Sequence, residues 1–265
     1  MPEIAADLAL ALQIADAADA ITMARFRATD LVIETKSDTT PVTEADKATE
    51  LDIRARLAES RPDDGILGEE FSDTIGHHRR WIVDPIDGTK NYLRGVPVWC
   101  TLLALESDGE LIVGVASAPA LGRRWWAATG LGAWTSDVDG TIRRTSVSNV
   151  DSLAAASFSY SDEEYWDEIG AYQGLRDLIA GCWRTRAYGD FLSHVLVAEG
   201  AIDIAAEPAL MPWDMAALIP IVTESGGQIT SYQGGNALTE GNAVTTNGHL
   251  HDAVLRLLPS GPEPR

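Results

Sequence analysis

The pattern of apolar and turn-forming residues changes near the middle of the chain, and this change restricts the possible fold more than any other feature. Between residues 98 and 146, apolar runs alternate with turn signals such as Ser107-Asp108-Gly109, which predicts an antiparallel meander. After residue 150, strand-like and helix-like segments alternate, which is typical of an α/β arrangement. We therefore expect an N-terminal α+β half over residues 1–145 and a C-terminal α/β half over residues 146–265.

The spacing of apolar residues predicts the individual elements. In the first half we expect helices over 3–27 and 43–60, and short strands over 65–68 and 81–84. In the second half we expect strands over 154–160, 183–188, 201–206, 228–232 and 243–246, and helices over 163–180, 191–199, 215–225 and 249–257. Thr43 and Asp46 have the spacing of a capping box, with Asp in place of Glu or Gln.

The charge balance limits the classes of partner. The chain has 20 basic and 40 acidic residues, so its formal charge is 20 − 40 = −20. Such a surface repels nucleic acid and anionic lipid, and an anionic substrate would need bound cations at its site. No stretch is long and apolar enough to span a bilayer. Cys100 and Cys182 sit in apolar surroundings that favour buried, reduced thiols, so we expect a cytoplasmic enzyme without nucleic-acid or membrane partners.

The most informative segment is Asp84-Pro85-Ile86-Asp87-Gly88-Thr89, which follows an apolar strand. Two carboxylates on a stiff strand-to-turn unit can converge on hard cations, which prefer oxygen ligands. The backbone N–H groups of Gly88 and Thr89 can bind a phosphate oxygen at the start of the following helix. The alternative is purely structural, because Asp-Pro and Asp-Gly are common turn dipeptides.

Three further acidic residues also stand at the ends of strands or the starts of helices. Glu69 follows the apolar strand that ends at Gly68, whereas Asp46 and Asp214 stand at the starts of apolar helices. Taken singly, Asp214 is better interpreted as a helix N-cap, and the helix dipole favours an acid at Asp46.

Together these motifs resemble one known family. The order and spacing of Gly68-Glu69-Glu70, Asp84-Pro85-Ile86-Asp87-Gly88-Thr89 and Trp213-Asp214 resemble the inositol monophosphatase-like family of metal-dependent phosphatases, over about residues 5 to 255. The resemblance implies a layered α-β-α-β-α sandwich, usually a homodimer, with Mg²⁺ ions, two or three per site. Two metal ions can stabilise both the attacking and the leaving oxygen of a phosphate ester.

The resemblance also implies roles for single residues. Metal ligands are expected at Glu69, Asp84, Asp87, Asp214 and the carbonyl of Ile86. Asp46 and Thr89, with Glu69, are expected to orient the attacking water, and Asp87, Gly88 and Thr89 to contact the substrate. Lys36 and Asp38 lie in the stretch that resembles the family's mobile loop, although Lys36 is equally explained as a solvated lysine.

The motifs expected on the substrate side are less specific than the metal-binding motifs. The run Arg184-Thr185-Arg186-Ala187-Tyr188-Gly189-Asp190-Phe191 resembles the histidinol-phosphate branch, and Glu207 matches a substrate-contacting acid of the wider family. Carboxylates at Asp190 and Glu207 would pair with the ammonium group of histidinol phosphate. Alternatively, Asp190 caps the next helix, Arg186 forms a surface ion pair instead of reaching substrate phosphate, and His194 is a satisfied core histidine.

Three functions therefore remain open at this point. The first is a Mg²⁺-dependent phosphatase acting on histidinol phosphate in histidine biosynthesis. The second is the same chemistry on inositol phosphate or a related small phosphorylated metabolite. The third is a non-catalytic protein that binds metal or phosphate.

Overall fold

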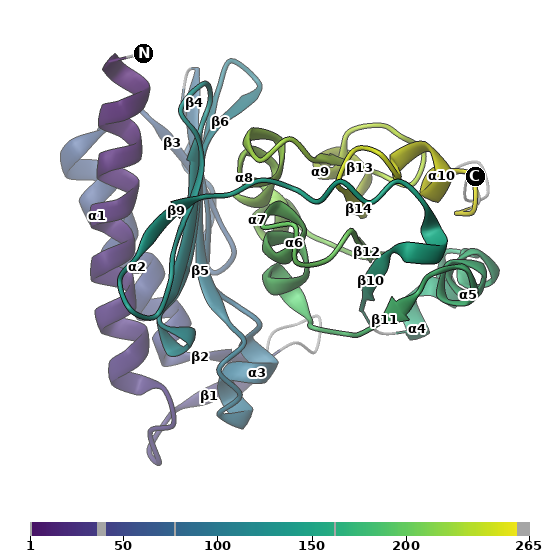
Figure 1. The fold of residues 1–265 in the computed structure, drawn as a ribbon. Helices are drawn as coiled ribbons and strands as arrows, with labels where there is room; N and C mark the ends of the chain where they lie inside the picture. The colour runs from purple at the N-terminus through teal and green to yellow at the C-terminus, as the bar shows by residue number, and fades with distance from the viewer. Residues whose placement is uncertain (1, 36–40, 77, 162, 259–265) are drawn as a thin grey trace. The chain divides into compact units, whose positions relative to one another are not determined.

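The computed structural model describes residues 2–35, 41–76, 78–161 and 163–258 (Figure 1). Lys36 and Asp38, expected in a mobile loop, lie outside the described residues. By its internal contacts the chain separates into two units, Met1–Arg144 with Ala216–Ile221, and Thr145–Met215 with Val222–Arg265. Residues 216–221 therefore return to the first unit, and we call them the returning segment. The expected division into 1–145 and 146–265 stays a prediction about domains.

A seven-stranded sheet organises the first unit, in the order β3-β4-β5-β6-β7-β8-β9. Its strands are β3 Gly65–Gly68, β4 Arg79–Asp87, β5 Cys100–Ser107, β6 Glu110–Ala118, β7 Arg123–Ala128, β8 Gly132–Ser136 and β9 Ile142–Arg144. β3 pairs with β4 in parallel, and all later pairs are antiparallel, which confirms the predicted meander. The remaining elements of this unit are α1 Pro2–Arg25, β1 Ile33–Thr35, β2 Pro41–Thr43, α2 Glu44–Ser60, α3 Thr89–Arg94 and the 3₁₀ turn Pro119–Leu121.

The two long helices α1 and α2 cover one face of this sheet (Figure 1). Ile14 of α1 and Ile53 of α2 pack with Trp81 and Val83 of β4 in one buried apolar cluster. Side chains alternate between the faces of a strand, so Ile82 and Asp84 of β4 project to the opposite face. Burial of the apolar cluster thus fixes which carboxylates of β4 face away from α1 and α2.

The returning segment packs on that opposite face. Gly114 of β6 pairs with Ala104 of β5, which in turn pairs with Ile82 of β4, so these three positions share the face of Asp84. A Cβ atom added at Gly114 would lie 2.1 Å from the carbonyl oxygen of Ala217 and 2.6 Å from Cγ of Pro220. Only glycine therefore allows this close approach of backbone to strand.

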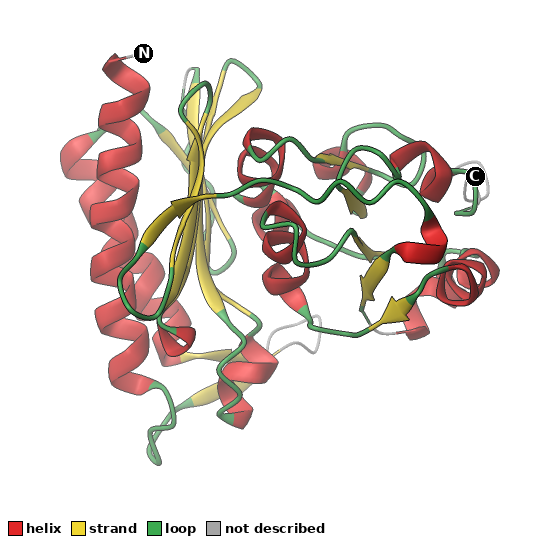
Figure 2. Ribbon diagram, in the orientation of Figure 1, coloured by secondary structure: helices red, strands yellow, loops and turns green. Residues whose placement is uncertain are grey.

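The second unit contains a mixed five-stranded sheet in the order β11-β10-β12-β14-β13 (Figure 2). β10 is parallel to both β11 and β12, whereas β14 is antiparallel to β12 and β13. The strands are β10 Ser157–Tyr160, β11 Arg184–Thr185, β12 Ile204–Glu207, β13 Gln228–Thr230 and β14 Ala243–Thr246. The helices after residue 145 are α4 Glu163–Glu168, α5 Tyr172–Gly181, α6 Asp190–Ala198, α7 Pro212–Met215, α8 Leu218–Glu224, α9 Ala237–Glu240 and α10 His251–Leu255, with a 3₁₀ turn at Leu153–Ala155.

Several expected elements differ from those observed. The helix expected over 163–180 is split into α4 and α5 around Gly170, whose φ is +71°. The helix expected over 215–225 is also split, because Pro220 has no N–H to donate to the Ala216 carbonyl. The strand expected over 183–188 shrinks to Arg184–Thr185, and α9 was not anticipated.

Two further expectations can be compared with the structure. Both cysteines are free, but Cys182 is only half-buried, whereas Cys100 is fully buried as expected. None of the helices formed by the described residues combines the length and the apolar character needed to cross a bilayer.

We predict that Gly114→Ala destabilises the protein and displaces the returning segment. Its new methyl group would collide with backbone and a proline ring, and overpacking of this kind costs about 1–3 kcal/mol of unfolding free energy. Urea unfolding measures this loss. Gly181→Ala is the matched control, because apart from adjacent residues and its own helix backbone no described atom lies within 4 Å of its Cβ position. Equal stability of the two variants would contradict this packing.

Candidate metal and substrate site

The end of β4 is irregular, and this irregularity builds the acidic site. Asp84 pairs with Leu102 and Asp87 pairs with Cys100, so Pro85 and Ile86 together oppose a single residue of β5. This arrangement is a β-bulge, a place where a strand tolerates proline. Oδ1 of Asp84 accepts a hydrogen bond from the Ile86 N–H at 2.9 Å, and the Thr101 hydroxyl donates to the Pro85 carbonyl at 2.9 Å.

The bulge decides where the two aspartates point. In a regular strand, residues three apart project to opposite faces. The extra residue of the bulge shifts this alternation by one, so Asp87 joins Asp84 on the face away from α1 and α2. Both residues are buried, with 2% and 8% of their surface exposed.

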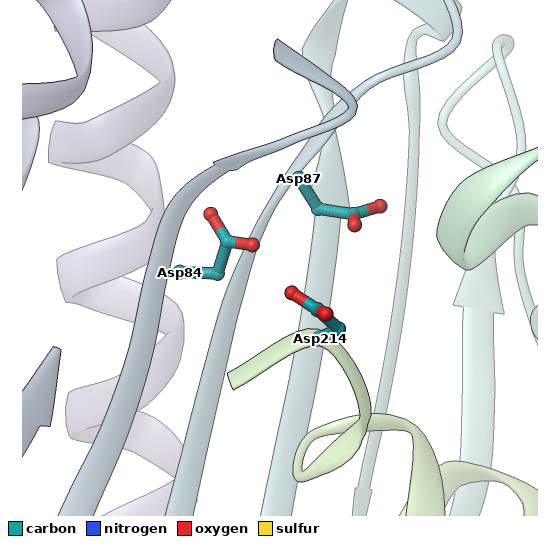
Figure 3. Close-up of side chains that lie close together, drawn as sticks. All are labelled: Asp84, Asp87 and Asp214. Atoms are coloured by element: carbon teal, nitrogen blue, oxygen red, sulfur yellow. The ribbon is translucent and has the colours of Figure 1, made fainter. Parts of the chain in front are cut away.

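Asp214 completes a group of three carboxylates (Figure 3). One oxygen each from Asp84, Asp87 and Asp214 lie within 4.8 Å of one another. Asp214 stands in α7, two residues before the returning segment, and its Oδ2 accepts the Met211 N–H at 2.7 Å. Asp214 lies inside α7 and reaches back to the residue before the helix, so its interpretation as the N-cap residue is wrong, and its carboxylate also contributes to the cluster.

The donor set of this cluster fits a hard divalent cation. Three like charges at this separation repel one another, and burial strengthens the repulsion. Carboxylate oxygens are the ligands that Mg²⁺ and Ca²⁺ prefer. Within the described residues the geometric group contains these three aspartates alone, so Glu69 and the Ile86 carbonyl remain predicted ligands.

Asp46 and Thr89 lie next to each other at one edge of the first unit's site. The capping box is present, because the Thr43 hydroxyl accepts from the Asp46 N–H, and the Thr43 N–H donates to Asp46 Oδ2 at 2.8 Å. The Thr89 hydroxyl is 3.4 Å from Asp46 Oδ1 and 3.0 Å from the Ile86 carbonyl oxygen. Burial, and less strongly the negative charge of Glu69, raise the pKa of Asp46 to about 6. The influence of Glu69 on this pKa also places Glu69 near Asp46.

A buried ion pair on α2 holds the loop that carries Glu69, and the sequence reasoning missed it. Glu50 has no exposed side-chain surface; its Oε1 accepts from Arg54 Nε at 2.7 Å, and its Oε2 accepts from the Glu70 N–H at 2.8 Å. Arg54 donates to the Phe71 carbonyl at 3.0 Å. A Cβ at Gly68 would lie 2.1 Å from Glu50 Oε1. The i,i+4 spacing of Glu50 and Arg54 was the available signal.

Asp190, expected on the substrate side, has an unusual backbone. α6 begins at Asp190 itself, and the N-cap position is Gly189. The capping alternative for Asp190 is therefore wrong, because its helix starts one residue earlier than expected. Asp190 has φ +47°, in the left-handed region that non-glycine residues seldom adopt.

Glu207 and Arg186 have contrasting surroundings. Glu207 ends β12 and is 8% exposed. Arg186 is exposed, and its guanidinium donates to the Thr185 carbonyl at 2.7 Å. Neither Arg184 nor Arg186 forms an ion pair with a described residue, so the structure offers no support for the surface ion pairs considered as an alternative.

Comparison with known proteins decides the family. The model of the inositol monophosphatase family matches residues 4–263. The chain belongs to the inositol monophosphatase family. Two members of similar sequence are named histidinol-phosphatase: one from Mycobacterium tuberculosis, 56% identical over 96% of this chain and 98% of its own, and one from Streptomyces coelicolor, 53% identical over 97% and 98%.

A solved structure supports the same assignment. The extragenic suppressor protein suhB from Bartonella henselae superposes with a TM-score of 0.88 at 32% identity, covering 97% of this chain and all of its own. The expected fold of the inositol monophosphatase type is thereby confirmed, with mixed sheets flanked by helices.

We predict that the aspartate cluster responds to divalent cations in a way that Asp87→Asn removes. Saturating Mg²⁺, at about a hundredfold its Kd, should raise the wild-type unfolding midpoint by about 5–10 °C relative to EDTA. In Asp87→Asn this rise should vanish, whereas its midpoint in EDTA should be unchanged or higher because one repelling charge is gone.

Asp63→Asn, at an exposed acid, is the control for this experiment and should retain the full Mg²⁺ response. An undiminished Mg²⁺ response in Asp87→Asn would exclude the cluster as the cation site.

We also predict unequal costs for two ion pairs on α2. Arg54→Ala leaves the buried Glu50 carboxylate without its cation, which should cost about 3–5 kcal/mol of unfolding free energy. Arg56→Ala breaks the exposed i,i+4 pair with Asp52 and should cost about 0.5 kcal/mol. Chemical unfolding of both variants measures the difference. Similar costs would show that the Glu50–Arg54 pair has no special role.

Proposed function

We propose that this protein is a Mg²⁺-dependent phosphatase that hydrolyses L-histidinol phosphate to L-histidinol and inorganic phosphate, a step of histidine biosynthesis. The observation that carries the proposal is the likeness, at 53–56% identity over nearly the whole chain, to two proteins named histidinol-phosphatase. The geometry of the site supports the reaction, and the roles of its residues are part of the proposal.

The acidic residues would hold the metal. Asp84, Asp87 and Asp214 are its proposed ligands, joined by Glu69 and the Ile86 carbonyl. When bound, Mg²⁺ supplies positive charge that offsets the phosphate dianion and lowers the pKa of water. The bulge and the buried Glu50–Arg54 pair keep these protein groups in place before any substrate arrives.

Asp46 and Thr89 are the proposed proton-accepting pair. The Thr89 hydroxyl lies within reach of Asp46 Oδ1, and the Asp46 carboxylate is anchored at its other oxygen by the Thr43 N–H. A pKa raised to about 6 makes Asp46 a better proton acceptor near neutral pH than an ordinary aspartate. Thr89 would orient the attacking water, and Asp46 would accept its proton through the Thr89 hydroxyl. Contacts of Asp87, Gly88 and Thr89 with the phosphate stay predictions.

The choice of an amino-alcohol phosphate follows from the acids on the substrate side. The ammonium group of histidinol phosphate can form charge-assisted hydrogen bonds to Asp190 and Glu207, whereas inositol offers hydroxyl groups alone. Asp190 holds a strained backbone conformation, and strain of this kind clusters at binding sites. The expected homodimer, cytoplasmic location and role for Arg186 are further parts of this proposal.

Phosphate release from L-histidinol phosphate and from inositol 1-phosphate, with Mg²⁺ and with EDTA, tests the proposal. We expect at least a tenfold higher kcat/KM for histidinol phosphate, and no turnover in EDTA. A preference for inositol phosphate would overturn the substrate assignment while leaving the metal site untouched.

Asp190→Asn sharpens this test, because Asn also tolerates positive φ and differs from Asp mainly in charge. It should lower kcat/KM for histidinol phosphate by about tenfold, the loss of one charge-assisted hydrogen bond. The value for inositol phosphate should change much less. Equal losses on both substrates would count against an ammonium contact.

A further inference from the structure

Glu207 is held by a histidine that has no part in the chemistry described so far. His194 lies on α6 and is 1% exposed. Its Nε2 is 3.1 Å from Glu207 Oε1, and its Nδ1 is 2.7 Å from the hydroxyl of Thr245 on β14. The imidazole of His194 therefore links α6 to the neighbouring strands β12 and β14 of the second unit.

The partners fix the position of the protons on this ring. An ionised carboxylate can only accept hydrogen bonds, so the proton of the neutral imidazole must be on Nε2, facing Glu207. Nδ1 then accepts the hydrogen bond of the buried Thr245 hydroxyl. This chain of donors orients the ring and holds Glu207 Oε1, leaving Oε2 of the carboxylate for another donor.

When His194 is neutral, its hydrogen bond leaves the negative charge of Glu207 in place. Glu50, the comparable buried acid of the first unit, is compensated by the guanidinium of Arg54. Glu207 forms no ion pair with a described arginine or lysine, and its hydrogen-bond partner is the imidazole of His194. Because a buried charge is costly without a counter-charge, this carboxylate is best satisfied by a cationic ligand.

Tyr232 contributes a second, uncharged neighbour. It is 5% exposed and stacks on Trp166, with ring centroids 5.3 Å apart. Burial, and then the negative charge of Glu207, raise the pKa of Tyr232 well above its usual value. The phenol therefore stays protonated and adds no charge that would compete with a cation.

We propose that His194 is a positioning residue for substrate specificity: it orients Glu207 without neutralising it, so that the carboxylate selects phosphate esters bearing an ammonium group. This inference rests on the proposed function and extends it to a residue that does not touch the substrate. Thr245 orients the His194 ring in turn, through the hydrogen bond between its hydroxyl and Nδ1.

Two substitutions of His194 separate its two hydrogen bonds. The amide nitrogen of Gln in His194→Gln can take the place of Nε2 and still donate to Glu207, whereas that of Asn in His194→Asn reaches only the place of Nδ1. We expect His194→Asn to lower the ratio of kcat/KM for L-histidinol phosphate to that for inositol 1-phosphate by tenfold or more, through KM. His194→Gln should restore the ratio to within about threefold of wild type.

A binding measurement keeps the test independent of chemistry and of folding yield. L-Histidinol alone should raise the unfolding midpoint of wild type and His194→Gln, and that rise should be lost in His194→Asn. His249→Asn, at an exposed histidine, is the matched control and should behave as wild type.

The outcomes distinguish the two proposals. A wild-type enzyme without preference for histidinol phosphate would refute the proposed substrate. A wild-type preference that His194→Asn retains, with unchanged stabilisation by histidinol, would overturn the role of His194 alone. Equal loss of the ratio in the Asn and Gln variants would likewise overturn it, because a purely structural histidine would not distinguish the two.

Discussion

The bulge at Pro85 and Ile86 is the constraint on which the rest of the site depends. Asp84 and Asp87 are three positions apart, so a regular strand would place one of them in the apolar cluster under α1 and α2. One extra residue removes this conflict and brings both carboxylates to the face of Gly114 and the returning segment. The bulge is stabilised from within by the Asp84 carboxylate and from the neighbouring strand by Thr101. A local defect in strand pairing is therefore what makes two anions close neighbours.

Helix α2 positions further residues of the site. Asp46, Glu50 and Arg54 follow one another at intervals of four residues, and side chains at that spacing share a helix face. Asp46 is anchored by its hydrogen bond with Thr43. Glu50 accepts a hydrogen bond from the Glu70 N–H and Arg54 donates one to the Phe71 carbonyl, both in the backbone after β3. One rigid helix thereby sets both the proposed proton acceptor and the loop bearing Glu69. The ion pair is compensated internally, in contrast to Glu207, whose partner is the imidazole of His194.

Sequence reasoning predicted the parts of this molecule that local rules determine. The capping box at Thr43, the strand ending in the Asp84 motif and the antiparallel meander are present, because each follows from short-range patterns. It did not find the bonds of Glu50 to Glu70 or of His194 to Glu207, because partners 20 and 13 residues apart meet only after the sheets form. It also left open that Asp190 caps its helix, since Gly-Asp before an apolar run gives no sign of a positive φ. The position of Asp87 relative to Asp84 depended on the bulge, for which Pro85 within a strand was the one visible signal.

The returning segment has a consequence for how this chain can be divided. Residues 216–221 belong by their contacts to the first unit, although some seventy residues of the second unit precede them. A fragment ending near residue 144 would leave the surface around Gly114 bare, and a fragment beginning there would carry an apolar strand-binding piece without its sheet. A cut at this border would therefore separate residues 216–221 from the strand against which they pack.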